Sequence, residues 1–126
     1  MILNCLAVGA GGAIGAVSRY LLGLLPIKMQ SGFPFTTLII NIIGAFCIGM
    51  IAAAVEKNTE LNAKLILFLK VGICGGFTTF STFSLEALGL LQNGKYGVGI
   101  LYMVLSVILC ILACIAGELL IKKMRG

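Results

Sequence analysis

The sequence contains no histidine, no aspartate and no tryptophan, and its acidic residues are limited to four glutamates. A histidine-based catalytic triad is therefore impossible, and too few side chains are available to hold a metal-activated water. The five cysteines form no C-x-x-C pair, and their expected role is that of small apolar side chains in helix packing. We therefore expect a protein that is not an enzyme.

Charged residues are also scarce, at 10% of the 126 residues, whereas 60% are hydrophobic and the mean hydropathy is +1.17. This composition is too apolar for a water-soluble domain, and a helix that crosses a bilayer needs about 20 apolar residues. We predict an all-α integral membrane protein with one four-helix domain over residues 1–126. We do not expect its first span to be a cleaved signal peptide. The predicted spans are residues 2–25, 38–55, 65–91 and 96–121.

The net charge of +5 does not call for a nucleic-acid partner, because basic residues also anchor membrane proteins to anionic headgroups. An even number of spans puts both termini and the middle linker on one side, so eight of the nine basic residues divide five against three, while the ninth, Lys70, lies within the third span. This weak bias leans towards cytoplasmic termini and permits insertion in both orientations. The five are Lys57, Lys64, Lys122, Lys123 and Arg125, and the three are Arg19, Lys28 and Lys95.

Glycines at four-residue spacing let helix backbones approach closely in lipid. Gly11 and Gly15 form such a pair in the first span, and Gly72 and Gly76 form another in the third. We expect the first pair to serve helix packing. Four helices with so many small residues leave little room for a polar conduit inside one bundle, so we also expect an oligomer, most simply a dimer.

The segment GGFTTFSTFS, residues 75–84, interrupts the third span with two glycines, three phenylalanines and five hydroxyl groups. Each glycine destabilises a helix by about 1 kcal/mol relative to alanine. The segment falls near the middle of the span, and we predict that the helix is broken there, in mid-membrane. Such a break is tolerated only where it is buried in protein, lines water or holds an ion.

If a helix resumes after the break, the side chains from Thr79 onwards are distributed over its faces by helical spacing. Thr79, Thr82 and Glu86 then share one face, and Phe80 and Phe83 occupy the adjoining one. Phenyl edges are weakly positive and hydroxyls donate hydrogen bonds, so together they suit a small anion that is dehydrated but not trapped. The alternative is that the rings face lipid and the hydroxyls bond to their own helix.

Two further polar sites point inward from other spans. Asn41 stands four residues after Thr37 in an apolar stretch, and an asparagine in hydrocarbon needs a partner or a solvated pathway. Tyr102, Ser106 and Cys110 follow one another at four-residue spacing along the fourth span. We expect a pathway role for Asn41 and a packing role for Cys110.

Two basic residues lie inside or near the spans. Arg19, late in the first span, either snorkels to the interface or attracts anions to a vestibule. Lys70 precedes the glycine doublet by five residues, and its expected behaviour is to snorkel.

Three segments, GGAIGAVSRY, TLIINIIGAF and GICGGFTTFSTFSLE, occur in this order in a four-span chain. In these segments, and over essentially the whole chain, the sequence resembles the CrcB/Fluc fluoride channels. The resemblance implies an antiparallel, dual-topology homodimer with two fluoride pores in a prokaryotic inner membrane, where it would be in contact with lipid. It also implies a passive channel that relieves fluoride toxicity.

The resemblance implies roles for individual residues. Phe80 and Phe83 match phenylalanines whose ring edges face fluoride, and Asn41 matches a pore asparagine. The backbone carbonyls of Gly75 and Thr78 match the ligands of a structural sodium ion (Na+) on the dimer axis. The other implied residues are Thr37, Thr79, Thr82, Tyr102 and Ser106 as pore-lining groups, Glu86 near the pore and Arg19 near the vestibule. Cys110 departs from the expected hydroxyl character, and no role is implied for Lys70.

Three alternatives to a fluoride channel remain open. A small proton-coupled multidrug exporter of the four-helix dual-topology type needs a membrane-embedded carboxylate, typically in the first span, and that span has none. A fluoride/proton antiporter likewise needs a titratable coupling site. A non-transporting assembly subunit predicts that the purified protein conducts nothing.

Overall fold

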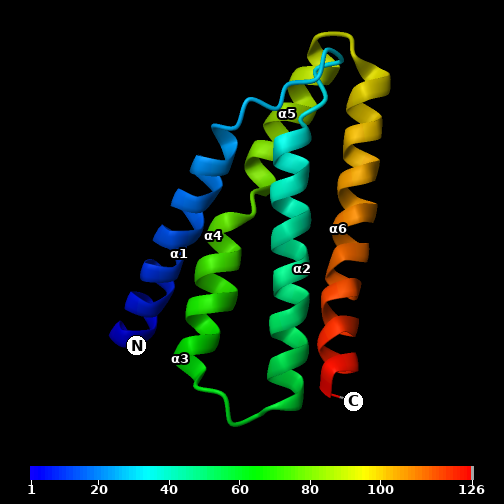
Figure 1. Cartoon of the computed structure of the whole chain (residues 1–126). Helices are drawn as coiled ribbons and strands as arrows, with labels where there is room; N and C mark the ends of the chain where they lie inside the picture. The colour runs from blue at the N-terminus through cyan, green and yellow to red at the C-terminus, as the bar shows by residue number, and fades with distance from the viewer. Residues whose placement is uncertain (126) are drawn as a thin grey trace.

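The computed structural model describes residues 1–125, and within that range every regular element is a helix (Figure 1). Four helical stretches are long and apolar enough to cross a membrane: Ile2–Gly23, Phe35–Lys57, Ala63–Gln92 and Tyr96–Met124. They confirm the four predicted spans, with ends shifted by a few residues. The elements are α1 (Ile2–Gly23), α2 (Phe35–Lys57), α3 (Ala63–Ile66), the π-helix η1 (Leu67–Cys74), α4 (Gly75–Phe77), α5 (Phe80–Gln92) and α6 (Tyr96–Arg125).

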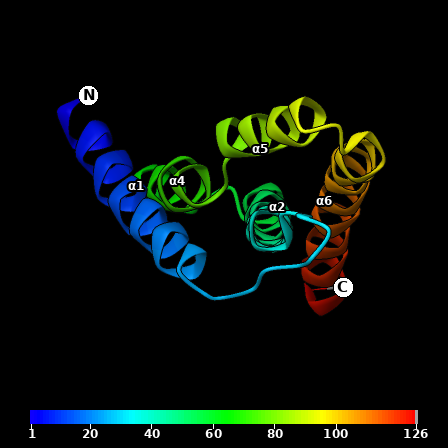
Figure 2. The ribbon, with the colours of Figure 1, turned by 90° about the horizontal axis from the view of Figure 1, so that it is seen from above.

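The helices pack mainly as two pairs. α1 lies along η1 and α4, α2 lies along α6, and α5 leaves the first pair to lean on α6 (Figure 1 and Figure 2). The N-terminus, the end of α6 and the α2–α3 connection lie at one end of the molecule. The α1–α2 and α5–α6 connections lie at the other end (Figure 1). This arrangement places α5 opposite the first half of α2, where the candidate site is built.

Glycines bring α1 into backbone contact with the third span. Gly11 and Gly15 are the buried residues of α1, and a Cβ on either would overlap a carbonyl oxygen of η1. From the other side, a Cβ on Gly72 would lie 2.8 Å from the Cα of Gly11. The prediction that Gly11 and Gly15 serve packing is therefore confirmed. In lipid, such close backbone approach replaces the hydrophobic effect as the source of attraction between helices.

We expect the Gly15→Val variant to lose most of its folded protein. Its Cβ would overlap the Ile73 carbonyl oxygen and lie 2.8 Å from the Phe77 amide nitrogen, and backbone atoms cannot move aside cheaply. Overpacking of this kind destabilises by about 3 kcal/mol or more. Thermal unfolding in detergent measures the loss. The control is Gly9→Val in the same helix, where nothing lies within 4 Å of an added Cβ. Equal melting temperatures for the two variants would contradict the packing account.

The third span is interrupted after Phe77 and not at the glycine doublet. Gly75 is helical, with φ −64° and ψ −38°, whereas Thr78 and Thr79 have extended backbone angles of −79°/157° and −147°/116°. The interruption therefore lies within residues 75–84 and follows the glycine doublet. Gly76 packs instead, since a Cβ there would lie 2.6 Å from the carbonyl oxygen of Gly12.

Candidate functional site

The side chain of Asn41 binds the backbone at the interruption. Its Nδ2 donates to the carbonyl oxygen of Thr79 at 3.1 Å, and its Oδ1 accepts from the Thr79 amide at 2.8 Å. Both groups would otherwise lack the partners that a continuous helix supplies, and buried unpaired backbone groups are costly. Asn41 therefore has the partner that its sequence position requires, and that partner is the backbone of Thr79, the residue before α5, and not another side chain.

The helix ends on either side of the interruption are capped by side chains. Thr79 Oγ1 accepts from the Thr82 amide at 3.1 Å, which is the usual N-cap arrangement, here for α5. At the other end, Arg19 Nε donates to the Gly76 carbonyl oxygen at 3.2 Å, placing a cation at the C-terminus of α4. Thr78 Oγ1 donates to the Cys74 carbonyl oxygen at 3.0 Å. Arg19 is thus held by the protein itself.

A carboxylate joins three elements beyond the interruption. Glu86 on α5 accepts from Thr37 Oγ1 at 3.1 Å and from the Tyr102 hydroxyl at 3.0 Å. Tyr102 is fully buried and Thr37 is nearly so. The sequence had singled out all three residues, but helical spacing within one span cannot show that they meet across α2, α5 and α6.

Aromatic rings form a row from the surface of α5 into the core. The ring centroids of Phe80 and Phe83 lie 5.4 Å apart, and those of Phe83 and Tyr102 lie 5.1 Å apart. Phe33, which sequence reasoning missed, meets Tyr102 edge-to-face at 5.4 Å and 80°. Phe80 is 78% exposed, so its ring has free edges on the protomer surface.

Two hollows adjoin at the interruption, and Thr79 lines both. The first, termed the groove, is a mostly apolar depression of about 410 Å³ bordered by α2, α5, α6 and the junction of η1 with α4. The second, termed the vestibule, has about 770 Å³ and lies beneath the α1–α2 connection. Of the residues singled out in the sequence, the groove is lined by Asn41, Gly75, Thr78, Thr79, Phe80, Phe83, Ser106 and Cys110. The vestibule is lined by Arg19, Thr37, Thr79, Thr82 and Glu86.

One hydroxyl in the groove has no internal partner. Ser106 is 6% exposed, and its Oγ is the only buried oxygen or nitrogen without a hydrogen bond among the side chains of residues 1–124. Buried polar atoms are nearly always satisfied, so an unpaired one marks a place where a further group can bind. Cys110 lies one helical turn further along α6 and lines the same groove.

Two lysines that sequence reasoning had assigned only to the charge balance also line the vestibule. Lys28 comes from the α1–α2 connection and Lys95 from the turn before α6. Together with Arg19 they place three cationic side chains around a hollow whose lining includes one carboxylate, that of Glu86. The exposed Lys70 lines neither hollow. No local signal marked the two lysines, because their convergence depends on how the connections fold over the hollow.

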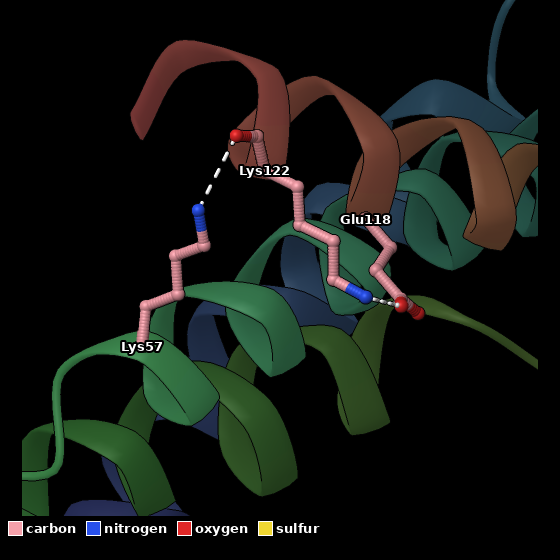
Figure 3. A network of polar contacts seen from close by, with 3 residues as sticks. All are labelled: Lys57, Glu118 and Lys122. Carbon is pink, nitrogen blue, oxygen red and sulfur yellow. Dashed lines mark hydrogen bonds and ion pairs between the residues drawn. The ribbon is translucent and has the colours of Figure 1, made fainter. Parts of the chain in front are cut away.

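A separate polar cluster ties the far ends of α2 and α6 together (Figure 3). Lys57 Nζ donates to the Lys122 carbonyl oxygen at 3.3 Å, and Lys122 Nζ lies 2.5 Å from Glu118 Oε1. The pair Glu118–Lys122 is partly exposed and lies within α6 at i, i+4 spacing, so solvent screens it and it stabilises the fold only weakly. The cluster lies at the opposite end of α2 and α6 from the vestibule and serves to join these helices.

These features define a small α-helical membrane protein, with four apolar spans around a hydroxyl- and ring-lined groove and a vestibule with three cationic side chains. Within residues 1–125 no cluster of acidic, histidine or cysteine side chains is suited to hold a metal ion. Residues 6–118 match the family model described as "CrcB-like protein, Camphor Resistance (CrcB)". The chain therefore belongs to the CrcB family.

Curated relatives cover nearly the full chain. The fluoride-specific ion channel FluC of Ruminiclostridium cellulolyticum is 48% identical over 126 residues, which are 99% of this chain and 97% of that protein. FluC of Agrobacterium fabrum is 40% identical over 92% of this chain and 94% of its own length. FluC of Rhizobium meliloti is 43% identical over 96% of this chain and 98% of its own length. With four spans and bacterial relatives of this kind, the chain is a multi-pass prokaryotic membrane protein.

Proposed function

We propose that this protein is a fluoride-selective passive ion channel, which lets fluoride leave the cytoplasm down its electrochemical gradient and so reduces fluoride toxicity. The observation that carries the proposal is the similarity, at 40–48% identity and over nearly the full length, to proteins named fluoride-specific ion channels. The site supports it, because its lining suits a small anion and needs no covalent step. The protein is accordingly proposed to have no enzymatic activity.

The two hollows supply a route. An anion drawn into the vestibule by Arg19, Lys28 and Lys95 reaches Thr79, which also lines the groove. In the groove it meets the ring edges of Phe80 and Phe83 and, further along, the unpaired hydroxyl of Ser106. Ring edges and hydroxyl donors replace part of the hydration shell without presenting a full positive charge. The anion is therefore partly dehydrated and still free to leave.

The driving force needs no coupling site. Neutral hydrogen fluoride crosses the membrane and ionises in the less acidic cytoplasm, where the anion is retained. A membrane potential that is negative inside drives a monovalent anion outwards with about 2.3 kcal/mol per 100 mV. A proton-coupled drug exporter would instead need a free carboxylate in the first span. α1 contains none, and Glu86 is occupied by two hydroxyl donors.

We also propose that two copies assemble as an antiparallel, dual-topology homodimer, with the interruption of the third span in mid-membrane. Nearly equal lengths of helix precede and follow Thr78 and Thr79. The groove is open, and both Gly75 and the 78% exposed Phe80 border it, so a second copy would complete a closed pore. The nearly balanced basic residues support insertion in both orientations.

The carbonyl oxygens of Gly75 and Thr78 fit a structural sodium ion. Within residues 1–125 no hydrogen bond is donated to either oxygen, and both residues line the groove. Hard cations prefer oxygen ligands of this kind. Two carbonyls from each copy would supply four oxygens, and the bound ion would hold the interrupted segments of the two copies together.

Removal of sodium is expected to weaken the dimer at least about tenfold, which corresponds to about 1.4 kcal/mol. The measurement is the monomer–dimer equilibrium in detergent, with sodium replaced by N-methyl-D-glucamine. Gly75→Val gives an independent check: a Cβ at this position meets only the Lys70 carbonyl oxygen, at 3.9 Å. The protomer should therefore fold while the dimer weakens. A dimer of unchanged affinity in both experiments would exclude the sodium assignment.

Growth of a bacterial strain that lacks its own fluoride export tests the proposed function in cells. Expression of the chain should restore growth in millimolar fluoride at mildly acidic pH, where hydrogen fluoride enters fastest. The same cells should gain no resistance to cationic drugs. Drug resistance without fluoride resistance would favour the exporter. The absence of both kinds of resistance would favour the assembly subunit.

A further inference from the structure

The α1–α2 connection, residues 24–34, forms one wall of the vestibule and is tied to the α5–α6 turn. Lys95 Nζ donates to the Ser31 carbonyl oxygen at 3.3 Å. The backbone of Lys95 is itself fixed, since its amide donates to Leu90 at 2.8 Å and its carbonyl accepts from Gly99 at 2.9 Å. The lysine therefore fastens a connection without regular structure to a rigid turn.

The tethered connection is linked to the Glu86 carboxylate of the vestibule through the rings of Phe33 and Tyr102. The amide of Phe33 donates to Ser31 Oγ at 3.3 Å, and the Phe33 ring meets the Tyr102 ring edge-to-face at 5.4 Å. The hydroxyl of Tyr102 donates to Glu86 at 3.0 Å. Contacts thus run without a gap from Lys95 through Ser31, Phe33 and Tyr102 to Glu86.

We propose that Lys95 and Phe33 are positioning residues for the Glu86 carboxylate. Lys95 fixes Ser31, Phe33 then holds the Tyr102 ring in place, and the Tyr102 hydroxyl keeps Glu86 turned towards α6. An untethered connection lets the ring of Tyr102 tilt and releases one of the two hydrogen bonds that occupy the carboxylate. A released carboxylate turns into the vestibule and repels an entering anion. The inference rests on the proposed function, because it assigns Glu86 to the path of a permeating anion.

A substitution at Lys28 distinguishes the effect of the tether from simple attraction of the anion by positive charge. Lys28 belongs to the same connection, lines the same hollow and makes no hydrogen bond or ion pair with residues 1–124. Replacing Lys28 or Lys95 by glutamine removes the same charge from the same hollow. Only the change at Lys95 also weakens the tether.

The test measures fluoride efflux from proteoliposomes for Lys95→Gln, Lys28→Gln and Phe33→Leu, each alone and together with Glu86→Gln. We expect Lys95→Gln and Phe33→Leu to slow efflux about fivefold, as the loss of one hydrogen bond or one ring contact allows. Lys28→Gln should slow it about twofold or less. In the Glu86→Gln background, Lys95→Gln should cause only the loss of about twofold or less that Lys28→Gln causes, because no carboxylate is left to turn into the vestibule and only a cationic charge is removed. Equal losses for the two lysine variants, or the full fivefold loss from Lys95→Gln in the Glu86→Gln background, would overturn the proposal.

Amide hydrogen exchange supplies a readout that does not depend on transport. Exchange within residues 27–33 should accelerate in Lys95→Gln and stay at the wild-type rate in Lys28→Gln. If the wild-type protein carries no fluoride, the proposed function fails, whereas the exchange experiment still decides whether the tether exists. Unchanged exchange in Lys95→Gln would refute the tether even in an active channel.

Discussion

Fluoride efflux through the Phe80→Ile variant is expected to fall about tenfold or more, with no loss of folded protein. Phe80 is 78% exposed on the protomer and borders the groove, so its ring contributes little to the core. Isoleucine keeps the apolar volume but lacks the positive ring edge, and edge interactions of about 1.5 kcal/mol correspond to roughly a tenfold change in rate. Efflux from proteoliposomes and thermal unfolding of the same preparation measure the two quantities.

The neighbouring phenylalanine should behave differently in one respect. Phe83→Ile is also expected to slow efflux about tenfold, but Phe83 packs on Tyr102 at 5.1 Å and this variant should unfold at a lower temperature. The matched control is Leu85→Ile on the same helix, where the side chain is 70% exposed and lines neither hollow. Wild-type efflux in both phenylalanine variants would remove the ring-edge account. An equal loss in Leu85→Ile would show a general effect of α5.

The second large effect is expected at Asn41. Replacing it by leucine leaves both the amide and the carbonyl of Thr79 without a partner, each loss costing about 1–3 kcal/mol. We therefore expect the free energy of unfolding to fall by about 2–6 kcal/mol, and efflux to fall with it because the groove and the vestibule meet at Thr79. Chemical unfolding in detergent measures the first quantity.

The Asn41→Asp variant separates the contributions of the two hydrogen bonds that Asn41 makes with Thr79. A carboxylate still accepts from the Thr79 amide, at 2.8 Å in the wild-type protein, but it cannot donate to the Thr79 carbonyl. Its stability should fall between those of the wild type and Asn41→Leu. A leucine variant as stable as the wild type would show that Asn41 does not support the interruption.

Much of the fold could be predicted because a long apolar run in lipid can satisfy its backbone hydrogen bonds only as a helix. The packing role of Gly11 and Gly15 could be predicted as well, because it depends on their spacing within one helix. Sequence reasoning placed the interruption within residues 75–84 but could not say at which residue, because Gly75 is helical and Gly76 packs on Gly12. The chain leaves the helix only at Thr78, where a side chain from α2 takes over the backbone hydrogen bonds.

The candidate site was predictable residue by residue but not in its connections. Asn41, Glu86 and Tyr102 stand out as polar groups in apolar helices, yet their partners lie on other spans. Neither Phe33 nor Lys95 is marked by the sequence as part of the site, because each lies in a connection between spans, and Lys95 entered only the charge balance. Their roles depend on contacts such as that between Lys95 and Ser31, which are 64 residues apart in the chain. Long-range contacts of this kind cannot be read from local pattern.

Fluoride efflux from liposomes that contain only the purified protein tests the central claim most directly. A fluoride electrode follows the anion after the membrane potential is set with a potassium ionophore, and parallel liposomes loaded with chloride provide the control. Rapid loss of fluoride with retention of chloride is the predicted result. Retention of both anions, or equal loss of both, would contradict a fluoride-selective channel.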